Sequence, residues 1–329
     1  MIYYAPKYAK KFKCAASDCR DSCCIGWEIA VDEDTLRKYN AAEGALFEDI
    51  RKSVTEDGCF RLTEGERCPH LLKNGLCRII CEAGEEALCE ICREHPRFYN
   101  DYGSHAEWGL GLACESAAEL ILSEAEPYLL SKEERKGEPS ELTSLYAHLF
   151  PQRQRMLIFA ADESFCISSK LFLLELWANK LQYFVDNCDI GKEIFTYSDD
   201  PVVEEPFFTQ ERFDNYKNLL LALEPLDKDF PRRFEKITEV PKSLSSHPEY
   251  GRILAYYIYR YFLLSSVDED IKGHMGMALF CTAMTVALCE SEGRHTREQI
   301  LEAAKDFSKE IEYSEENAEA VTEAFSAFI

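Results

Sequence analysis

Hydrophobic and polar positions follow two different patterns along this chain of 329 residues, and the change falls near residue 120. After that point apolar residues recur with the spacing of amphipathic helices, which predicts an almost wholly helical C-terminal part. Thr296 with Gln299 has the form of a capping box, and Ser314 precedes two glutamates that suit a first helical turn. The predicted helices are 116–131, 141–163, 168–188, 208–223, 248–266, 274–291, 297–312 and 315–328, with loops at 131–140, 189–206 and 238–247.

Before residue 120 the patterned stretches are short. Residues 27–31 alternate enough for a brief strand, and residues 32–54 suit a helix with Asp32 as its N-cap. The pair Asn74-Gly75 predicts a hairpin turn. Residues 82–94 suit a helix that ends before a proline, and residues 98–112 suit another extended pair. Short elements of this kind predict a loop-rich unit.

Cysteine gives this first part its chemistry, because 11 of the chain's 15 cysteines lie in the first 114 residues. Four of them, Cys14, Cys19, Cys23 and Cys24, fall within eleven residues, and the last two are adjacent. Thiolates are soft, charged ligands, so several of them brought together require a cation or a network of disulfides. The other seven are Cys59, Cys68, Cys77, Cys81, Cys89, Cys92 and Cys114, and the predicted hairpin places Cys68 and Cys77 close together.

The sequence favours a metal centre over disulfides. The first residues contain neither the apolar run nor the small-residue cleavage site of a secretory signal, which predicts a cytoplasmic protein. Reducing conditions there oppose disulfides, and an odd number of cysteines leaves at least one unpaired. The longest uncharged apolar run, residues 277–289, is too short to span a membrane.

Charge excludes two classes of partner. The chain has 37 lysines and arginines against 60 aspartates and glutamates, which gives a net charge of −23. Nucleic-acid binders and proteins that lie on anionic membranes carry clustered positive charge instead. We therefore expect a soluble protein with no nucleic-acid partner and no membrane partner.

The spacing of the cysteines does not decide whether the metal is zinc or iron. Several cysteines are separated by two or three residues, as in the knuckles of structural zinc sites. The adjacent Cys23 and Cys24 are awkward for one knuckle, because neighbouring side chains rarely face the same ion. One of these sulfur atoms would ligate while the other packs or binds a second metal. An iron–sulfur cluster accepts thiolates from scattered loops and tolerates such irregular spacing.

The motifs that extend over about residues 7–125 are Cys14-x4-Cys19-x3-Cys23-Cys24, Gly26-Trp27, Val31-Asp32, Cys68-Pro69-x-Leu71, Asn74-Gly75-Leu76-Cys77, Gly84-Glu85-Glu86, Cys92-Arg93-x-x-Pro96-Arg97 and Leu112-Ala-Cys114-x-x-Ala117-Ala118. Their order and surroundings resemble the opening of the flagellin lysine-N-methylase family. This family belongs to a wider group of cysteine-cluster proteins regarded as zinc or iron chelators.

The resemblance implies methyl transfer from S-adenosylmethionine to lysine side chains of flagellin, with an iron–sulfur cluster. Flagellin, or another lysine-bearing protein, is then the partner, and zinc is the alternative metal. The metal ligands implied by the matching order are Cys14, Cys19, Cys23, Cys24, Cys68, Cys77, Cys92 and Cys114. Cys59, Cys81 and Cys89 are additional to the family pattern. The sequence has no glycine-rich nucleotide loop after a strand, so it identifies neither a methyl-donor site nor a catalytic base.

Other residues have simpler interpretations. His70 and His95 lie among the cysteines and are candidates for further metal ligands. Trp27 and Trp108 are expected in the apolar shell of the metal site. Tyrosines between residues 250 and 261 are expected to pack in the core. The remaining cysteines are expected to be small core residues, and they are Cys166, Cys188, Cys281 and Cys289.

These observations predict a mainly α-helical protein. Residues 1–120 would form a cysteine-rich, metal-held unit with short β-hairpins, docked on a helical bundle of residues 121–329. The functional hypothesis is an S-adenosylmethionine-dependent protein-lysine N-methyltransferase. The alternative is a non-catalytic iron–sulfur or zinc-binding module with a redox-sensing or partner-binding role.

Overall fold

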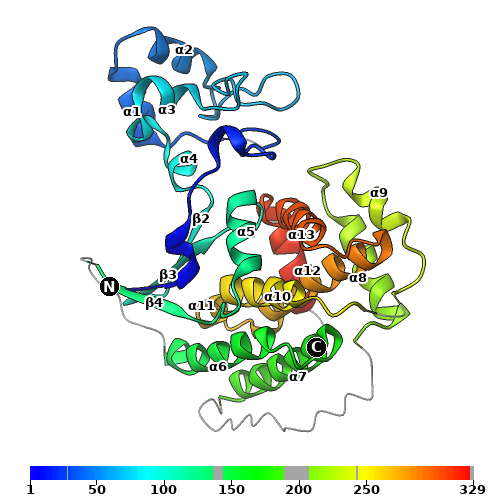
Figure 1. Ribbon diagram of the computed structural model, residues 1–329. Coiled ribbons are helices and arrows are strands. Elements are labelled where there is room, and N and C mark those ends of the chain that lie inside the picture. The colour runs from blue at the N-terminus through cyan, green and yellow to red at the C-terminus, as the bar shows by residue number, and fades with distance from the viewer. Residues whose placement is uncertain (28, 136–143, 189–206, 242–243, 327–329) are drawn as a thin grey trace. The chain divides into compact units, whose positions relative to one another are not determined.

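A computed structural model describes residues 1–27, 29–135, 144–188, 207–241 and 244–326. Helices dominate these residues and one small mixed sheet accompanies them (Figure 1), so the predicted mainly helical fold is confirmed.

The chain forms two compact units. The cysteine unit comprises Phe12–Phe98 and Cys114–Ser116, and the helical unit comprises Met1–Lys11, Tyr99–Ala113 and the chain from Ala117 onward. The two domains divided at residue 120 stay a prediction. In the compact units, residues 1–11 and 99–113 belong with the helices.

The sheet has the strand order β2–β3–β1–β4. Strand β1 (Ile2–Pro6) runs parallel to β3 (His105–Leu110) and antiparallel to β4 (Leu130–Glu134). Strand β2 (Arg97–Asp101) is the neighbour of β3, which confirms the extended pair predicted for residues 98–112. Residues Ala106 to Leu110 of β3 are all buried, so this strand contributes directly to the core.

Strand β4 is absent from the sequence-based prediction, which placed a helix and then a loop there. The sequence of β4, Leu-Ser-Lys-Glu-Glu, has no alternation of apolar and polar residues. It lies at an edge of the sheet, where charged residues are usual because they discourage further pairing. Its partner β1 is far away in the sequence, so no local pattern reveals the pairing.

The helical unit takes its name from its α-helices, which begin with the helix after Cys114. They are α5 (Glu115–Ser123), α6 (Ser144–Ala161), α7 (Ile167–Asp186), α8 (Gln210–Ala222), α9 (Phe230–Glu235), α10 (Pro248–Tyr261), α11 (Ser265–Asp268), α12 (Ile271–Glu292), α13 (Arg297–Glu312) and α14 (Glu315–Ser326).

Each of the eight predicted helices overlaps an observed helix, whereas α9 and the short α11 were not predicted as separate helices. The predicted ends at 141–143 and 327–328 lie outside the described residues. The capping box is confirmed, because Thr296 Oγ1 accepts from the Gln299 N–H at 3.3 Å. The Ser314 hydroxyl accepts from the Asn317 N–H at 3.1 Å, as its position before α14 predicted. The predicted loop 189–206 lies outside the described residues.

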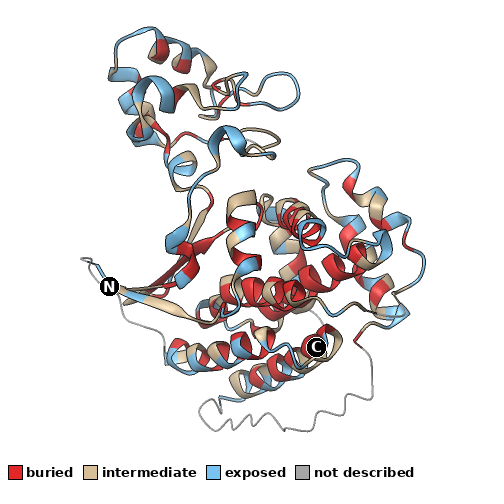
Figure 2. Cartoon of the chain, viewed as in Figure 1, coloured by how far each residue is buried: buried red, intermediate tan, exposed pale blue. Residues whose placement is uncertain are grey.

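Helix α12 is the core of the helical unit. It packs against α7, α10, α13 and α14, and its residues are buried from Ile271 to Cys289 except Lys272 (Figure 2). Of the helices that the structure describes, this is the one long and apolar enough to cross a membrane by length and composition. Protein covers 94% of its most apolar window, as in the central helix of a folded core.

An ion pair inside the helical unit joins the sheet to the helices. Arg153 of α6 donates from Nη2 to Oε1 of Glu107 on β3 at 2.6 Å, and from Nη1 to Oε2. Both side chains are completely buried, and the guanidinium lies 4.9 Å from the ring centre of Tyr259. Charged groups at such depth are tolerated because each has its partner.

The helices of the cysteine unit are short. They are α1 (Glu33–Ala41), α2 (Ala45–Ser53), α3 (Arg78–Ala83) and α4 (Glu90–Glu94), with 3-10 turns η2 (Ala16–Asp18) and η3 (Glu85–Ala87). Asp32 is an N-cap as predicted, since its Oδ1 accepts from the Thr35 N–H at 2.9 Å.

Two predicted helices of this unit are interrupted by glycine. The helix predicted over residues 32–54 is divided at Gly44, which has φ +114° and separates α1 from α2. The helix predicted over 82–94 is divided at Gly84, which has φ +83° and lies between α3 and η3. Both values lie in the left-handed region, where glycine has no steric cost and other residues do.

Extended segments of the cysteine unit pair only sparsely. Instead of the strand predicted for residues 27–31, the described residues there make isolated bridges, such as Ala30 with Cys59. The Asn74-Gly75 turn is confirmed: Leu71 pairs with Cys77, and the Leu72 N–H donates to the Leu76 carbonyl at 2.9 Å. That a metal holds this unit together stays a prediction.

We predict that Gly276→Ala destabilises the helical unit by about 1–3 kcal/mol, because overfilling a packed core forces neighbours to move. A Cβ at this position of α12 would lie 2.1 Å from Cγ of Phe325 on α14. Urea denaturation followed by circular dichroism measures the effect. Ser291→Ala, on the exposed end of the same helix, is the control and should change stability by less than about 0.5 kcal/mol. Equal stability of the two variants would contradict the prediction.

Candidate metal centre

Five cysteines share the apolar core of the cysteine unit, and we call them the inner thiols: Cys24, Cys68, Cys77, Cys89 and Cys92. Cys68 and Cys89 are 6% and 1% exposed, and the other three pack against the same cluster. The backbone joins distant parts of this group, since the Cys68 N–H donates to the Cys24 carbonyl at 2.8 Å. The Asn74-Gly75 turn then returns the chain to Cys77.

Backbone N–H groups are directed at several inner sulfur atoms. Cys77 is the N-cap residue of α3. Burial raises the pKa of its thiol, and the nearby backbone N–H groups of Ile79 and Ile80 lower that pKa in part. The Cys68 sulfur likewise accepts from the backbone N–H of His70. Such donors stabilise negative charge on sulfur and commonly surround metal-bound thiolates.

The thiols also bind one another. Hydrogen bonds from Cys23 and Cys68 hold the pKa of Cys24 well below its usual range. The same bonds, together with burial, raise the pKa of Cys23 and Cys68. Among these three thiols one pKa is lowered and two are raised, so repulsion opposes the ionisation of all three unless a cation is present.

Cys89 and Cys92 form a second hydrogen-bonded pair. The bond from Cys92 lowers the pKa of Cys89, while the same bond raises the pKa of Cys92. The charges of Cys24 and Cys68 also raise the pKa of Cys92.

Four further cysteines lie at the surface of the unit, and we call them the outer thiols: Cys14, Cys19, Cys23 and Cys114. The turn η2 brings the first two together, with the Ala16 N–H donating to the Cys14 sulfur at 3.4 Å. The Cys19 thiol lies 3.7 Å from a carboxylate oxygen of Glu115, the residue that follows Cys114. Burial raises the pKa of the Cys19 thiol, and the charge of Glu115 raises it further.

An ion pair fixes this arrangement of the outer thiols. The backbone N–H of Arg20 donates to Glu115 Oε2 at 2.8 Å, and its guanidinium donates to Oε1 at 2.5 Å. The segment that carries Cys19 is therefore tied to the segment that carries Cys114. All eight predicted ligands belong to either the inner or the outer thiols.

The two candidate histidines differ in their surroundings. His70 is hydrogen-bonded through Nε2 to the Ser53 hydroxyl at 2.9 Å, and burial lowers the pKa of this histidine. The ring centres of His95 and Trp27 are 6.0 Å apart. Burial lowers the pKa of His95 to about 4, although the charge of Cys24 acts to raise it. Of the two, His95 belongs to the surroundings of the thiols.

The two tryptophans belong to different units of the chain. Trp27 packs against the inner thiols and donates from Nε1 to the Cys23 carbonyl at 2.6 Å, as expected of a shell residue. Trp108 is buried in β3 of the helical unit, and its predicted place in the metal shell stays a prediction.

Both groups of thiols fit a thiophilic metal by chemistry. They offer soft sulfur donors, partly removed from water, with N–H groups directed at them. Among the residues that the structure describes, no three His, Cys, Asp or Glu side chains surround one point in ligand positions. The inner and outer thiols are therefore candidate metal ligands by their chemistry, and the described residues do not arrange them as a coordination sphere.

The family pattern missed one member of the inner thiols. Cys89 is additional to that pattern, yet it is the most deeply buried of the five. Its spacing of two residues from Cys92, typical of a metal knuckle, is the signal that could have identified it. Of the other additional thiols, Cys81 is exposed and Cys59 is half-buried.

The helical unit contains the remaining cysteines. Cys281 and Cys289 are buried in α12, as predicted, whereas Cys166 and Cys188 are exposed, and the prediction that they are core residues is wrong. The tyrosines of α10 from Tyr250 to Tyr259 are buried, as predicted, and Tyr261 is half-buried.

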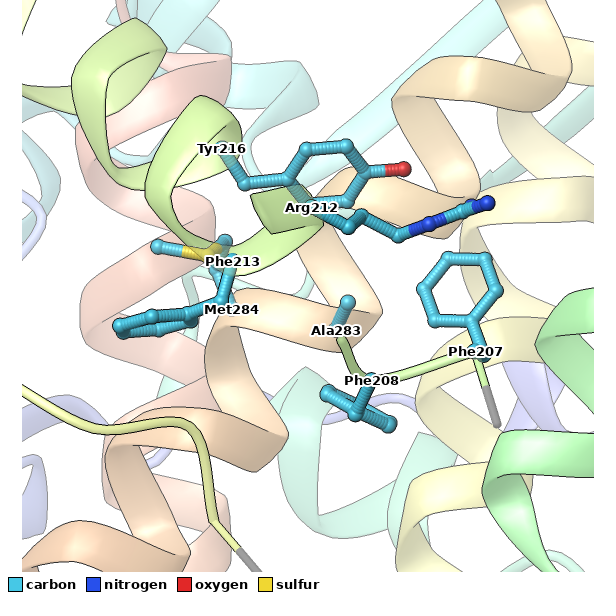
Figure 3. Close-up of a pocket in the computed structure, with 7 residues that line it drawn as sticks. All are labelled: Phe207, Phe208, Arg212, Phe213, Tyr216, Ala283 and Met284. Carbon is cyan, nitrogen blue, oxygen red and sulfur yellow. The ribbon is translucent and has the colours of Figure 1, made fainter. Parts of the chain in front are cut away.

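A small apolar pocket lies between the start of α8 and the middle of α12 (Figure 3). Its volume is about 10 Å³, which is room for one water molecule. The guanidinium of Arg212 lies 4.2 Å from the ring centre of Phe207 and pairs with Glu175 at 2.7 Å. The pocket is too small for a nucleoside, so we do not assign the methyl-donor site to it.

Curated relatives identify the family. The chain is 30% identical to the Lysine-N-methylase of Salmonella typhimurium over 172 residues, and equally to that of Salmonella choleraesuis. It is 30% identical over 136 residues to the Flagellar biosynthetic protein FliU of Salmonella muenchen, and this match covers 80% of FliU and 39% of the chain. The chain belongs to the flagellin lysine-N-methylase family.

Membership of the flagellin lysine-N-methylase family confirms the resemblance found in the cysteine motifs. The matches to the two lysine-N-methylases cover 50% of this chain and 41% of each relative, so the chain spans less than half of their length. No family model matches the chain. No solved structure matches it either.

Proposed function

We propose that the chain is a protein-lysine N-methyltransferase that transfers methyl groups from S-adenosylmethionine to lysine side chains of flagellin. The observation that carries the proposal is its 30% identity to two proteins named lysine-N-methylase over half of the chain. A third relative is named as a flagellar biosynthetic protein, which makes flagellin the first substrate to test. We place the protein in the cytoplasm, with an iron–sulfur cluster on its thiols and zinc as the alternative metal.

In the proposed reaction the bond between the methyl carbon and the sulfonium sulfur breaks, and a bond from that carbon to the lysine nitrogen forms. The thioether S-adenosylhomocysteine leaves, and the nitrogen releases one proton to water. Only the neutral amine has a lone pair for this attack, so lysine must lose its charge first. The net charge of −23 favours the approach of a lysine-bearing protein surface.

The thiols have a supporting part in this proposal. An iron–sulfur cluster bound through three thiolates would supply an iron able to accept oxygen and nitrogen ligands. The inner thiols lie in the apolar core of the cysteine unit, and Cys77 is the N-cap residue of α3. Trp27 covers this core beside His95.

The test is intact-mass spectrometry of flagellin after incubation with anaerobically prepared protein and S-adenosylmethionine. We expect mass increases of whole methyl groups on surface lysines. Cys19→Ala and Cys92→Ala should abolish the activity, whereas Cys166→Ala, an exposed thiol of the helical unit, should keep it. Below the lysine pKa of roughly 10.4, the rate should rise by about tenfold per pH unit until another step limits it.

The possible outcomes separate the alternatives. Unmodified flagellin together with methylated proteins in a cell lysate would retain the enzyme and replace the substrate. Absence of methylation in both would contradict the enzyme and favour the non-catalytic metal-binding module.

A further inference from the structure

We propose that helix α7 carries a docking surface for a lysine-bearing helical segment of the substrate protein. The surface consists of Phe172, Leu173, Leu176 and Tyr183, and we call it the α7 stripe. This inference rests on the proposed function and adds to it a place at which the substrate protein is held.

Helix α7 is apolar on two opposite sides. One side is buried where α7 packs against α12 in the core of the helical unit. On the other side Leu176 is 46% exposed and Tyr183 is 61% exposed, while Phe172 and Leu173 are half-buried. Polar residues usually occupy the outer side of a surface helix, so apolar residues there call for a partner. Figure 1 shows α7 at the margin of the helical unit, where a partner can approach it.

The spacing of the α7 stripe fits another helix. Leu176 lies four residues after Phe172 and seven before Tyr183, and residues at these intervals share one side of a helix. Apolar residues seven apart, with others between them, form the seam along which two helices pack. With a rise of 1.5 Å per residue, the stripe extends for roughly 16 Å along α7. An amphipathic helix therefore matches both its shape and its chemistry.

Charge decides which helix is the partner. A second copy of the chain would bring two net charges of −23 together, and their repulsion opposes pairing through α7. A lysine-bearing segment has the opposite sign and is attracted. The exposed charged residues of α7 near the stripe, Lys180 and Asp186, balance each other, so the attraction comes from the acidic surface as a whole. The α7 stripe then supplies the apolar contact that fixes the docked segment.

The test measures binding of the full chain to immobilised monomeric flagellin from the same organism by interferometry. The double variant Leu176→Gln/Tyr183→Gln removes apolar surface and leaves the net charge unchanged. We expect its affinity to fall by about tenfold or more, because burial of one such side chain is worth roughly 1.5–3 kcal/mol. Leu221→Gln, at a 37% exposed position of α8, is the matched control and should bind as the unsubstituted chain does. Added salt should weaken all three proteins, since it screens the charges.

Methylation of flagellin, measured with the same proteins, separates docking from chemistry. In the double variant we expect KM for flagellin to rise by about tenfold and kcat to stay unchanged, as for loss of uniform binding. Equal affinity of the double variant and the unsubstituted chain would overturn the docking surface. So would an unsubstituted chain that does not bind flagellin. In both cases methylation by the unsubstituted chain would still support the proposed function, and its absence would count against that function separately.

Two further measurements test other occupants of the α7 stripe. Light scattering of the free chain would reveal a dimer, and a dimer lost in the double variant would assign the stripe to a second copy. Hydroxyl-radical footprinting should find Leu176 and Tyr183 reactive in the free monomer and protected once flagellin is bound. Protection in the free monomer would mean that the chain itself covers the stripe. Either result would overturn the proposal.

Discussion

Removing bound metal is expected to unfold the cysteine unit while the helical unit stays folded. The described residues of the cysteine unit have short helices and isolated bridges, and part of their core consists of thiols. Structural zinc contributes roughly 10–16 kcal/mol of apparent binding free energy in zinc-finger peptides, and this becomes folding free energy. The helical unit has its own core around α12, far larger than the thiol core.

Hydrogen exchange of the full chain, followed by mass spectrometry with and without a chelator, measures this effect. Peptides from residues 12–98 should lose protection, and peptides from α12 should keep it. Cys68→Ser, which removes a buried inner thiol, should act like the chelator, and Cys81→Ser should not. Equal loss of protection in both units, or in neither, would contradict the role of metal in folding.

Glu107→Ala is expected to destabilise the helical unit by about 3–5 kcal/mol, because it leaves the charge of Arg153 buried without its partner. Both side chains are 0% exposed, so water cannot replace the lost carboxylate. Urea denaturation can be followed by tryptophan fluorescence, since Trp108 and Trp177 are both buried in this unit. A loss of unfolding free energy below about 1 kcal/mol would contradict the prediction, because the buried pair would then contribute no more than an exposed one.

Two controls separate charge from packing. Asp229→Ala breaks the exposed pair between Asp229 and Arg232 and should cost less than about 1 kcal/mol. The double variant Glu107→Leu/Arg153→Met replaces the buried pair by apolar residues of similar size. It should recover most of the stability lost in Glu107→Ala, because buried ion pairs are often no better than good apolar packing.

Local patterns predicted those parts of the fold that depend on local interactions. The capping box at Thr296 and the N-cap at Asp32 act within one helical turn, and both are confirmed. Strand β4 depends on pairing with β1, and no local feature of its charged sequence carries that information. The spacing of apolar residues predicted continuous helices through Gly44 and Gly84. It contains no information about the positive φ of these glycines, which interrupts the helices in the structure.

The candidate site was predictable in composition but not in arrangement. The order of cysteines indicated eight candidate ligands, and their role as ligands stays a prediction. The structure packs Cys24, Cys68, Cys77 and Cys92 with Cys89 in one apolar core, and the other four are exposed or half-buried. The division into inner and outer thiols depends on burial and on the ion pair of Arg20 with Glu115. These are properties of the folded chain. The hydrogen bond between His70 Nε2 and the Ser53 hydroxyl is likewise a property of the folded chain.

The order of strands has a consequence for how the protein is made. The chain leaves β1 at Pro6 and returns to the sheet only at Arg97, so the cysteine unit lies between two segments of the helical unit. On the ribosome β1 emerges first, but both of its partners, β3 and β4, are synthesised after residues 12–98. All of the inner and outer thiols precede β4, and all but Cys114 also precede β3, so they leave the ribosome before that sheet can close. Delivery of metal to the nascent chain can therefore precede assembly of the helical core.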